Sequence, residues 1–195
     1  LYVFTGEVSD DAGQRPGTEG TLEWLGSSQL AGCPLVEDVV PLVERIRSRP
    51  GVERVAVGTN LPLGGSRMVF GFFPGAFPSP GETSESAEYH SVSPDYFRTL
   101  GVPLQQGRDF TAQDDEAGIQ VAVVSQTLAR QQWPGESPLG KRIRTVSQNG
   151  ITSREVVGVV GDVKHVGLAD ASAPQLYVPY AQDSWPLLTL VVRSG

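Results

Sequence analysis

Short runs of hydrophobic residues, many of them alternating with polar residues, recur along the whole chain and predict strands. Alternation indicates a strand with one buried face, whereas a continuous run such as VAVV indicates a strand that is buried on both faces. The stretches with these patterns are LYVFTGEV (1–8), VERVAVGTN (52–60), RMVFGFFPGAF (67–77), AEYHSV (87–92), VAVV (121–124), LGKRIRTV (139–146), REVVGVVGDVKHV (154–166), QLYVPY (175–180) and LLTLVVRSG (187–195).

One longer stretch, LVEDVVPLVERIRSR (35–49), has helical spacing instead, because its apolar residues recur three or four positions apart. Pro41 lies inside this stretch. The helix therefore either begins near Asp38, with Pro41 in its first turn, or kinks at Pro41. Together with the strands before and after it, this helix predicts that the fold begins with a βαβ-like unit.

The stretch SPDYFRTLG (93–101) carries the signals of a short capped helix. Ser93 is a favourable N-cap, Pro94 suits the first helical position, and Asp95 suits the positive end of the helix dipole. Gly101 is typical of the residue that ends a helix. We therefore predict a helix of about two turns.

A further capped helix is predicted at QTLARQQW (126–133), with Ser125 as its N-cap and Pro134-Gly135 at its end. Helices and strands follow one another in a mixed order rather than as a regular βαβα series. This order favours an α+β fold.

The segment GESPLGK (135–141) almost matches the P-loop that binds nucleotide phosphates. A P-loop needs a strand, a loop and a helix in that order, with Ser or Thr after its lysine. Here the predicted order is helix, loop and strand, residue 142 is Arg, and Pro138 removes one backbone donor. We therefore interpret the segment as a turn that leads into a strand.

The glycines of VVGVVGDVKHVG (156–167) are also spaced, but they lack the G-x-G-x-x-G pattern and the following helix of a dinucleotide site. Glycine inside a strand usually marks a bulge or close packing of two backbones. We expect one of these structural roles here.

Residues suited to catalysis or metal binding are few and scattered. His90, His165 and the single cysteine, Cys33, lie far apart in sequence. Ser93 is near His90 and Asp95, but the predicted helix cap explains it better, and there is no G-x-S-x-G motif. We expect no catalytic residue, no metal and no cofactor in this domain.

A group of acidic residues has neither the spacing nor the central glycine of an EF-hand calcium loop. We interpret the group as a solvated loop, since runs of acidic residues are usually exposed. Its members are Asp109, Asp114, Asp115 and Glu116.

The charge balance narrows the choice of partners. With 22 acidic and 15 basic residues among 195, the formal net charge is −7. Nucleic-acid binding needs a basic surface, and adhesion to anionic lipid headgroups needs one too, so we expect neither. No signal peptide is visible, and no apolar run approaches the ~18 residues of a membrane span. Both ends of the sequence have patterns typical of the middle of a strand-rich domain, so we expect a fragment of a longer protein.

One segment, MVFGFFPGAFPSPG (68–81), places four Phe residues among Gly and Pro. Alternation predicts that Phe70 and Phe72 face the core of a strand. The other interpretation is an exposed aromatic loop that contacts a partner. For that role the candidate contact residues are Phe72, Phe73 and Phe77.

Four segments in order, followed by QLYVPYAQ, are similar to one family, the extracytoplasmic core domain of MacB-type, FtsX-like ABC transporter permeases. The sequences of these segments most resemble the duplicated-permease group. The resemblance covers most of residues 40–195 and little of residues 9–35. The segments are VERIRSRPGVERVAVGTNLPLGG (43–65), VSPDYFRTLGVPLQQGRDF (92–110), VAVVSQTLARQQWPGESPLGKRIR (121–144) and VVGVVGDVKHVGL (156–168).

This resemblance implies an α+β, MacB-like periplasmic core domain made of two parts. Residues 1–92 and 151–195 would form a porter-like βαβ subdomain, and residues 93–150 a smaller α/β subdomain inserted into it. Such a domain lies between two membrane spans of a permease, on the periplasmic, extracytoplasmic face of the bacterial cytoplasmic membrane.

The resemblance also implies a non-catalytic role. ATP would be hydrolysed by a cytoplasmic ATPase subunit or domain, and the motion of the permease's own transmembrane helices would pass through this domain to another envelope protein or to a peptide or lipid substrate. We expect the isolated domain to be monomeric and to bind no nucleic acid. The alternative is an extracytoplasmic ligand-binding or sensor module.

Overall fold

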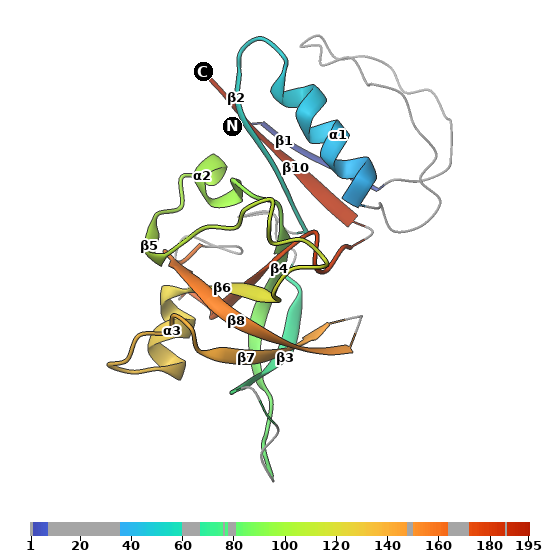
Figure 1. Ribbon diagram of the computed structural model, residues 1–195. Helices are drawn as coiled ribbons and strands as arrows, with labels where there is room; N and C mark the ends of the chain where they lie inside the picture. The colour runs from blue at the N-terminus through green and yellow to red at the C-terminus, as the bar shows by residue number, and fades with distance from the viewer. Residues whose placement is uncertain are drawn as a thin grey trace.

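The strands join into one mixed sheet in the computed structural model, which describes residues 2–7, 36–59, 67–75, 77, 81–147, 150–163, 172–185 and 187–195 (Figure 1). The helices are α1 (Val36–Arg47), α2 (Tyr96–Leu100) and α3 (Gln126–Gln132). The strands are β1 (Tyr2–Glu7), β2 (Val52–Gly58), β3 (Val69–Pro74), β4 (Glu85–Val92), β5 (Leu104–Gly107), β6 (Val121–Ser125), β7 (Arg142–Ser147), β8 (Gly150–Val160), β9 (Gln175–Pro179) and β10 (Leu187–Ser194). The predicted α+β class is confirmed.

The first and last strands lie side by side in the terminal sheet, here defined as β1, β10 and β2. Because β10 lies between β1 and β2 and is antiparallel to both, β1 and β2 run parallel to each other. They are joined through α1, which covers one face of the terminal sheet (Figure 1). The predicted βαβ-like unit is therefore present at the start of the chain, and the last strand, β10, lies between its two strands.

Alternation along β2 gives the terminal sheet two buried faces. Val55 and Val57 pack towards α1, in a cluster that includes its residues Val39, Val43 and Ile46. Ala56 belongs to a different cluster, on the opposite face of the sheet. Because successive residues of a strand point to opposite faces, one short strand contacts both α1 and the rest of the protein.

The helix α1 begins two residues before the predicted start at Asp38 and includes Pro41. Pro41 therefore lies beyond the first turn. Its side chain is exposed, whereas Val43 and Ile46 are buried against the terminal sheet, as their spacing predicts.

Six of the remaining strands close into a barrel, and β5 pairs with β8 outside this ring. Going round it, β4 pairs with β3, β3 with β7, β7 with β8, β8 with β6, β6 with β9, and β9 again with β4. The interior holds one hydrophobic cluster, to which α3 adds Leu128 and Ala129. The strand residues of this cluster are Phe72, Ala87, Tyr89, Ala122, Val124, Ile143, Val156, Val159, Leu176 and Val178.

The terminal sheet packs on the outside of the barrel through a cluster here named the joint. Its members are Ala56, Val92, Tyr96, Phe97, Phe110, Val121, Val123, Val160, Tyr177 and Val191. The sheet and the barrel are also hydrogen-bonded to each other, since Gly58 pairs with Val92 and the Val57 N–H donates to Ser93 Oγ at 2.9 Å. A Cβ on Gly58 would come within 2.7 Å of the Tyr96 ring, so glycine permits this close approach.

The predicted N-cap of α2 is wrong. Ser93 Oγ accepts the Val57 N–H instead of capping the helix, and α2 begins only at Tyr96. The residue before it, Asp95, has φ 64° and makes no side-chain cap hydrogen bond. The predicted end is confirmed, because Gly101 has φ 75° and donates its N–H to Arg98 O, a left-handed C-terminal cap that favours glycine.

The predicted helix α3 and its cap are confirmed, since Ser125 Oγ accepts the Leu128 N–H at 3.3 Å. The strand β5, which pairs with β8, was not predicted. The close packing predicted for glycine inside β8 is confirmed for Gly158. A Cβ on Gly158 would lie 2.3 Å from Arg108 O, just beyond the end of β5.

The predicted division at residues 93 and 150 stays a prediction. Strand β7, inside the predicted insert, pairs along its whole length with β8, which lies outside the insert except for Gly150, so both contribute to one barrel. Within the described residues, no helix is both long enough and apolar enough to span a membrane.

Candidate functional site

The three candidate contact residues differ in exposure. Phe72 is 1% exposed and lies inside the barrel, so it has no surface to offer a partner and its predicted contact role is wrong. The competing interpretation, in which alternation places Phe72 in the core, is the correct one. Phe73 is half-buried and Phe77 is 82% exposed. Partner contact by Phe73 and Phe77 stays a prediction.

Phe73 is held by a buried arginine on the neighbouring strand. Arg144 lies opposite Phe73 in the β3–β7 register, and its guanidinium carbon is 5.0 Å from the centre of the ring. The same guanidinium donates to Glu82 Oε1 and, through Nε at 3.3 Å, to Gly75 O. The residues on both sides of the β3–β4 connection are thereby joined to β7.

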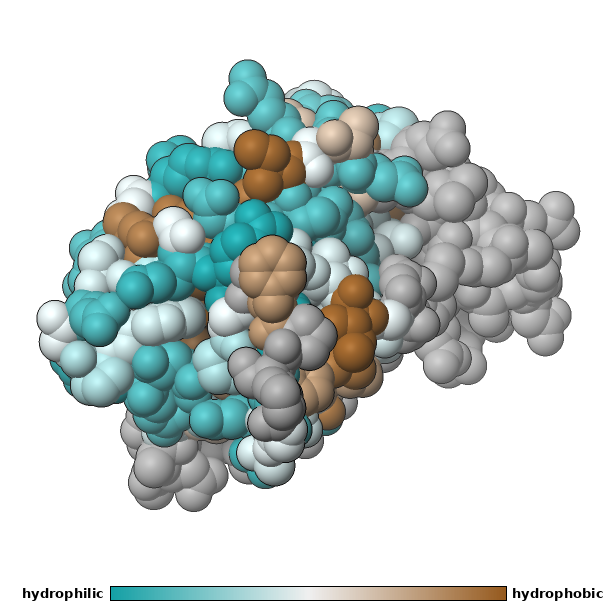
Figure 2. Space-filling model, turned by 60° about the horizontal axis from the view of Figure 1, so that its bottom comes forward, coloured by the Kyte–Doolittle hydropathy of each residue, from teal (hydrophilic) through white to brown (hydrophobic). Residues whose placement is uncertain are grey.

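The exposed Phe77 belongs to this β3–β4 connection, at the lower end of the molecule in Figure 1. Figure 2 views the molecule with that end brought forward. It shows hydrophobic residues standing apart on a largely hydrophilic surface rather than one broad apolar area. A contact here would therefore depend on a few protruding side chains.

The residues that sequence proximity suggested for catalysis make contacts with other residues in the structure. Ser93 Oγ accepts from Val57 and donates to Pro94 O, and the Asp95 carboxylate pairs with Arg98 and Arg47. His90 is 1% exposed, and its ring stacks on Tyr177 at 4.9 Å. His165 and Cys33 lie outside the described residues. In the part of the chain that is described, no group of three or more His, Cys, Asp and Glu residues is placed to hold a metal ion.

The near-P-loop has the order predicted for it, with α3, then a turn, then β7. Lys141 Nζ pairs with Glu136 Oε2 at 2.8 Å, within the segment itself. Backbone N–H groups of the segment donate to acceptors within the segment, since Leu139 N donates to Ser137 Oγ and Lys141 N to Pro138 O. Gly140 N donates across to Val156 O. This arrangement is a structural turn rather than a cradle for phosphate.

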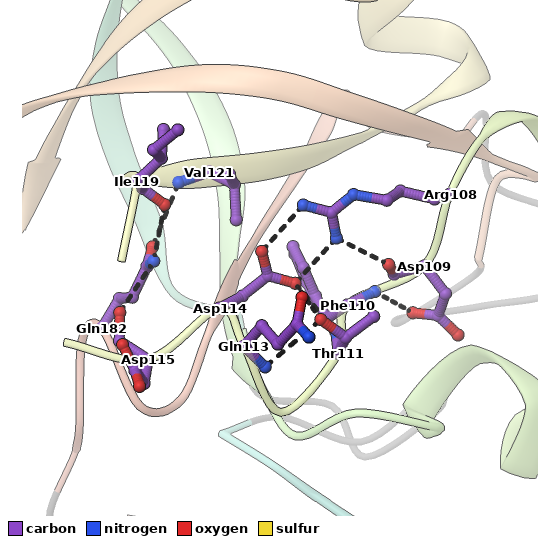
Figure 3. Close-up of polar contacts among 10 residues, drawn as sticks. All are labelled: Arg108, Asp109, Phe110, Thr111, Gln113, Asp114, Asp115, Ile119, Val121 and Gln182. Carbon is purple, nitrogen blue, oxygen red and sulfur yellow. Dashed lines mark hydrogen bonds and ion pairs between the residues drawn. The ribbon is translucent and has the colours of Figure 1, made fainter. Parts of the chain in front are cut away.

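The acidic loop is not simply solvated, because Asp114 is buried at its centre (Figure 3). Both carboxylate oxygens of Asp114 accept from Arg108, at 2.7 and 2.8 Å, and Oδ2 also accepts the Thr111 N–H at 2.8 Å. Burial alone would raise the pKa of Asp114, but the Arg108 and Thr111 hydrogen bonds outweigh it, so the pKa lies below its usual range. The solvated interpretation is therefore wrong for Asp114, although Asp115 and Glu116 are exposed.

Gln182 fixes the other side of this loop (Figure 3). Its Nε2 donates to the carbonyl oxygens of Asp115 and Ile119, and its Oε1 accepts the Val121 N–H at 3.1 Å. Sequence reasoning missed Gln182, because its partners are about sixty residues away and no local pattern marks it. The loop of residues 108–120 is thus a braced element that presents Ile119, which is 71% exposed.

A groove of about 350 Å³ lies between β5 and α3. Val159 and Ala129, both buried, belong to its apolar lining, and Trp133 and three glutamines lie around them. The complete lining is Gln105, Gln106, Gln126, Ala129, Arg130, Trp133, Pro134, Gly135, Glu136, Pro138 and Val159. Sequence reasoning missed the groove because it missed β5.

Residues 1–195 match the family described as the MacB-like periplasmic core domain. The chain belongs to this family. The resemblance found in its four segments is thereby confirmed, whereas the narrower likeness to the duplicated-permease group stays a prediction.

Two curated relatives of this MacB-like domain are ABC transporter proteins. It is 34% identical over 96 residues to the macrolide export ATP-binding/permease protein MacB of Aggregatibacter actinomycetemcomitans. It is 30% identical over 100 residues to the uncharacterized ABC transporter permease YknZ of Bacillus subtilis (strain 168). These matches cover 49% and 51% of this chain but 14% and 23% of the relatives. The chain therefore spans a small part of their length.

Among solved structures, the MacB-like domain resembles the periplasmic region of MacB from Actinobacillus actinomycetemcomitans. The TM-score is 0.54 at 19% identity, over 85% of this chain and 68% of that one. At this identity the likeness shows a shared fold and says nothing about shared ligands.

Proposed function

We propose that this MacB-like domain is the non-catalytic periplasmic part of an ABC transporter permease, and that it transmits ATP-driven motion of the membrane helices to a substrate or partner outside the membrane. Family membership supports its place in a permease. The packing of the joint is the observation that carries the transmitting role, because it connects the terminal sheet to the barrel.

Force entering this domain would reach the terminal sheet first. β1 and β10 are antiparallel neighbours, with Tyr2 opposite Val192. The first strand therefore begins, and the last strand ends, at the same side of the domain (Figure 1). Two membrane helices connected to these strands would push or turn them together.

The joint would carry that displacement into the barrel. Ala56 and Val191 are fully buried in it, and Phe97 meets Tyr177 edge to face at 4.9 Å. Close-packed interiors have few alternative arrangements, so the terminal sheet and the barrel should move as a rigid body rather than slide.

The partners of this proposal are the transmembrane helices of the same permease and a cytoplasmic ATPase subunit or domain. The domain would then work on the extracytoplasmic face of the membrane. An envelope protein, a peptide or a lipid would receive the motion, and neither a cofactor nor a catalytic residue would take part.

The experiment uses the complete permease with its ATPase in a lipid nanodisc. A fluorophore at the exposed Gln131 of α3 reports energy transfer to acceptor-labelled lipid headgroups. We expect the transfer to differ between the nucleotide-free and ATP-bound states. No difference would contradict transmission to the barrel.

A second label pair separates rigid-body motion from internal deformation. Labels at Arg45 of α1 and Gln131 of α3 lie on opposite sides of the joint. Their mutual distance should stay constant when nucleotide binds. If it changes, the joint bends, and the domain would be a hinged sensor module rather than a rigid transmitter.

A further inference from the structure

We propose that the groove between β5 and α3 binds a short extended peptide segment that carries a carboxylate. The proposal concerns the domain's own ligand and does not depend on whether the domain transmits motion. It rests on the charge of the groove, the composition of its rim and the nature of its apolar lining.

The charge of the groove selects an anionic group. Its rim holds one cation, Arg130, and one carboxylate, Glu136, but Glu136 is already paired with Lys141 at 2.8 Å. Arg130 is exposed and makes no ion pair with any residue that the structure describes. An arginine suits two-point recognition of a carboxylate. Its guanidinium is therefore available to an acidic group of a ligand in the groove.

The amide side chains of the rim suit the backbone of a peptide. Gln105 and Gln106 come from β5 and Gln126 from α3, so glutamines line the groove on two sides. Each amide offers both donors and an acceptor, the same groups that a peptide unit presents. Within the described residues, none of these three side chains makes a hydrogen bond, so all remain available to a ligand.

The lining between them suits small apolar side chains. Ala129 and Val159 are at most 8% exposed and continue the interior cluster of the barrel, and Pro138 is also buried. A volume of about 350 Å³ is at the small end of ligand sites, which favours a few residues of chain over a large molecule.

Trp133 is the feature that could favour a sugar instead. Saccharide sites generally use the exposed face of an aromatic ring as a platform. Trp133, however, is half-buried and packs against the barrel cluster. Its ring is therefore engaged with the core, and the rim amides together with Arg130 favour the peptide.

The test is ¹H–¹⁵N NMR titration of the full chain with a panel of acetylated tripeptides. The first two positions carry Ala, Val or Pro, the last carries Ala or Glu, and each peptide is made with a free and with an amidated C-terminus. We expect saturable shifts of the side-chain amides of Gln105, Gln106 and Gln126 and of the Trp133 indole. Amidation of a peptide that ends in Ala should weaken binding roughly tenfold, the size of one charged hydrogen bond.

Two variants with the same change of charge complete the design. Arg130→Gln should weaken binding of the free-carboxylate peptide roughly tenfold, to the level of the amidated peptide. Arg45→Gln, which removes an exposed arginine of α1 on the other side of the joint, should leave binding unchanged. An equal loss in both variants would reduce the interaction to general charge attraction and overturn the proposal.

Two further results would overturn it. The first is the absence of saturable shifts at the groove across the whole peptide panel. The second is binding of the disaccharide N,N′-diacetylchitobiose, tested alongside, in the absence of peptide binding. That result would make the groove a saccharide site.

Discussion

The guanidinium of Arg154 and the side-chain amide of Gln182 meet inside the protein, where Arg154 Nη1 donates to Gln182 Oε1 at 2.9 Å. Arg154 is 1% exposed, and its Nε donates to Thr145 Oγ1 at 3.2 Å. Burial lowers the pKa of Arg154 from its usual value, against the electrostatic influence of Tyr89 and Asp183. Gln182 in turn holds the loop of residues 108–120, so one amide joins the barrel interior to a surface loop.

Removal of the buried cation should destabilise the barrel. Arg154→Ala leaves Gln182 and Thr145 without their buried partner and opens a cavity, and we expect the free energy of unfolding to fall by about 3 kcal/mol. The exposed Arg45→Ala should change it by no more than about 0.5 kcal/mol. Urea unfolding followed by circular dichroism measures both, and similar losses in the two variants would contradict a special role for Arg154.

The two ends of the Gln182 amide can be tested separately. Gln182→Glu keeps an acceptor for Arg154 and Val121 but replaces the donor to Asp115 O and Ile119 O by a second oxygen. We therefore expect faster hydrogen exchange in the 115–119 loop, with the protection of the Val121 N–H preserved.

Gln182→Ala is the matched variant, because it removes both ends of the amide. It should also expose the Val121 N–H to exchange. If the two variants give the same exchange pattern, then Gln182 does not divide its roles between the barrel and the loop in this way.

The Asp114–Arg108 pair should make stability depend on pH. Asp114→Asn removes the charge that Arg108 contacts, and we expect a loss of about 2 kcal/mol at neutral pH. Because the folded pKa of Asp114 is lowered, its stabilisation is fully present above the unfolded pKa of about 4 and is lost as pH falls through the lower, folded value. The difference between wild type and variant should therefore shrink below about pH 4.

The measurement is urea unfolding of both proteins at several pH values between neutral and acid. Glu116→Gln, in the same loop but exposed, is the control and should show no comparable difference. A difference for Asp114→Asn that stays constant into acid would contradict the ionised pair.

Elements with strong local signals could be predicted from the sequence. Ser125 caps α3 as predicted, because a serine before a helical run needs only its own backbone neighbours to form the cap. The alternation of Val55, Ala56 and Val57 predicted a strand, although not which partner each face would meet.

Features that depend on distant residues could not be predicted. Ser93 has the sequence features of an N-cap, but its Oγ accepts the Val57 N–H instead. From the sequence, Asp114 resembles an exposed acid, but in the fold it is buried and pairs with Arg108. Arg154 likewise resembles an exposed strand residue, but the barrel buries it. The groove depends on β5, whose sequence LQQG has no alternating pattern and which forms only by pairing with β8.

The phenylalanines of the β3 segment should divide into core and surface residues. Phe72→Ala should lower the free energy of unfolding by about 4 kcal/mol, because it leaves a cavity in the barrel. Phe77→Ser should leave it within about 0.5 kcal/mol, since its side chain is 82% exposed. If Phe77 contacts a partner, Phe77→Ser should reduce the activity of the complete permease at unchanged stability. Full activity would remove Phe77 from the contact surface.

Val191 and Val192 offer the sharpest test of the joint, because they are adjacent in β10 and buried on opposite faces. Val191 faces the barrel with Ala56, whereas Val192 packs in the cluster that includes α1. Replacing either by Ala removes the same atoms from a buried site, and we expect each to cost about 2 kcal/mol of unfolding free energy.

Their effects on the permease should nevertheless differ. Val191→Ala loosens the contact that would transmit motion, so ATP hydrolysis should continue while the nucleotide-dependent change in energy transfer from Gln131 diminishes. Val192→Ala, at similar stability, should leave that change intact, because it weakens only the packing beneath α1. Equal effects of the two variants would mean that general stability, rather than the joint, sets the response. The comparison thus measures coupling separately from folding, since the lost volume is the same and only its side of the sheet differs.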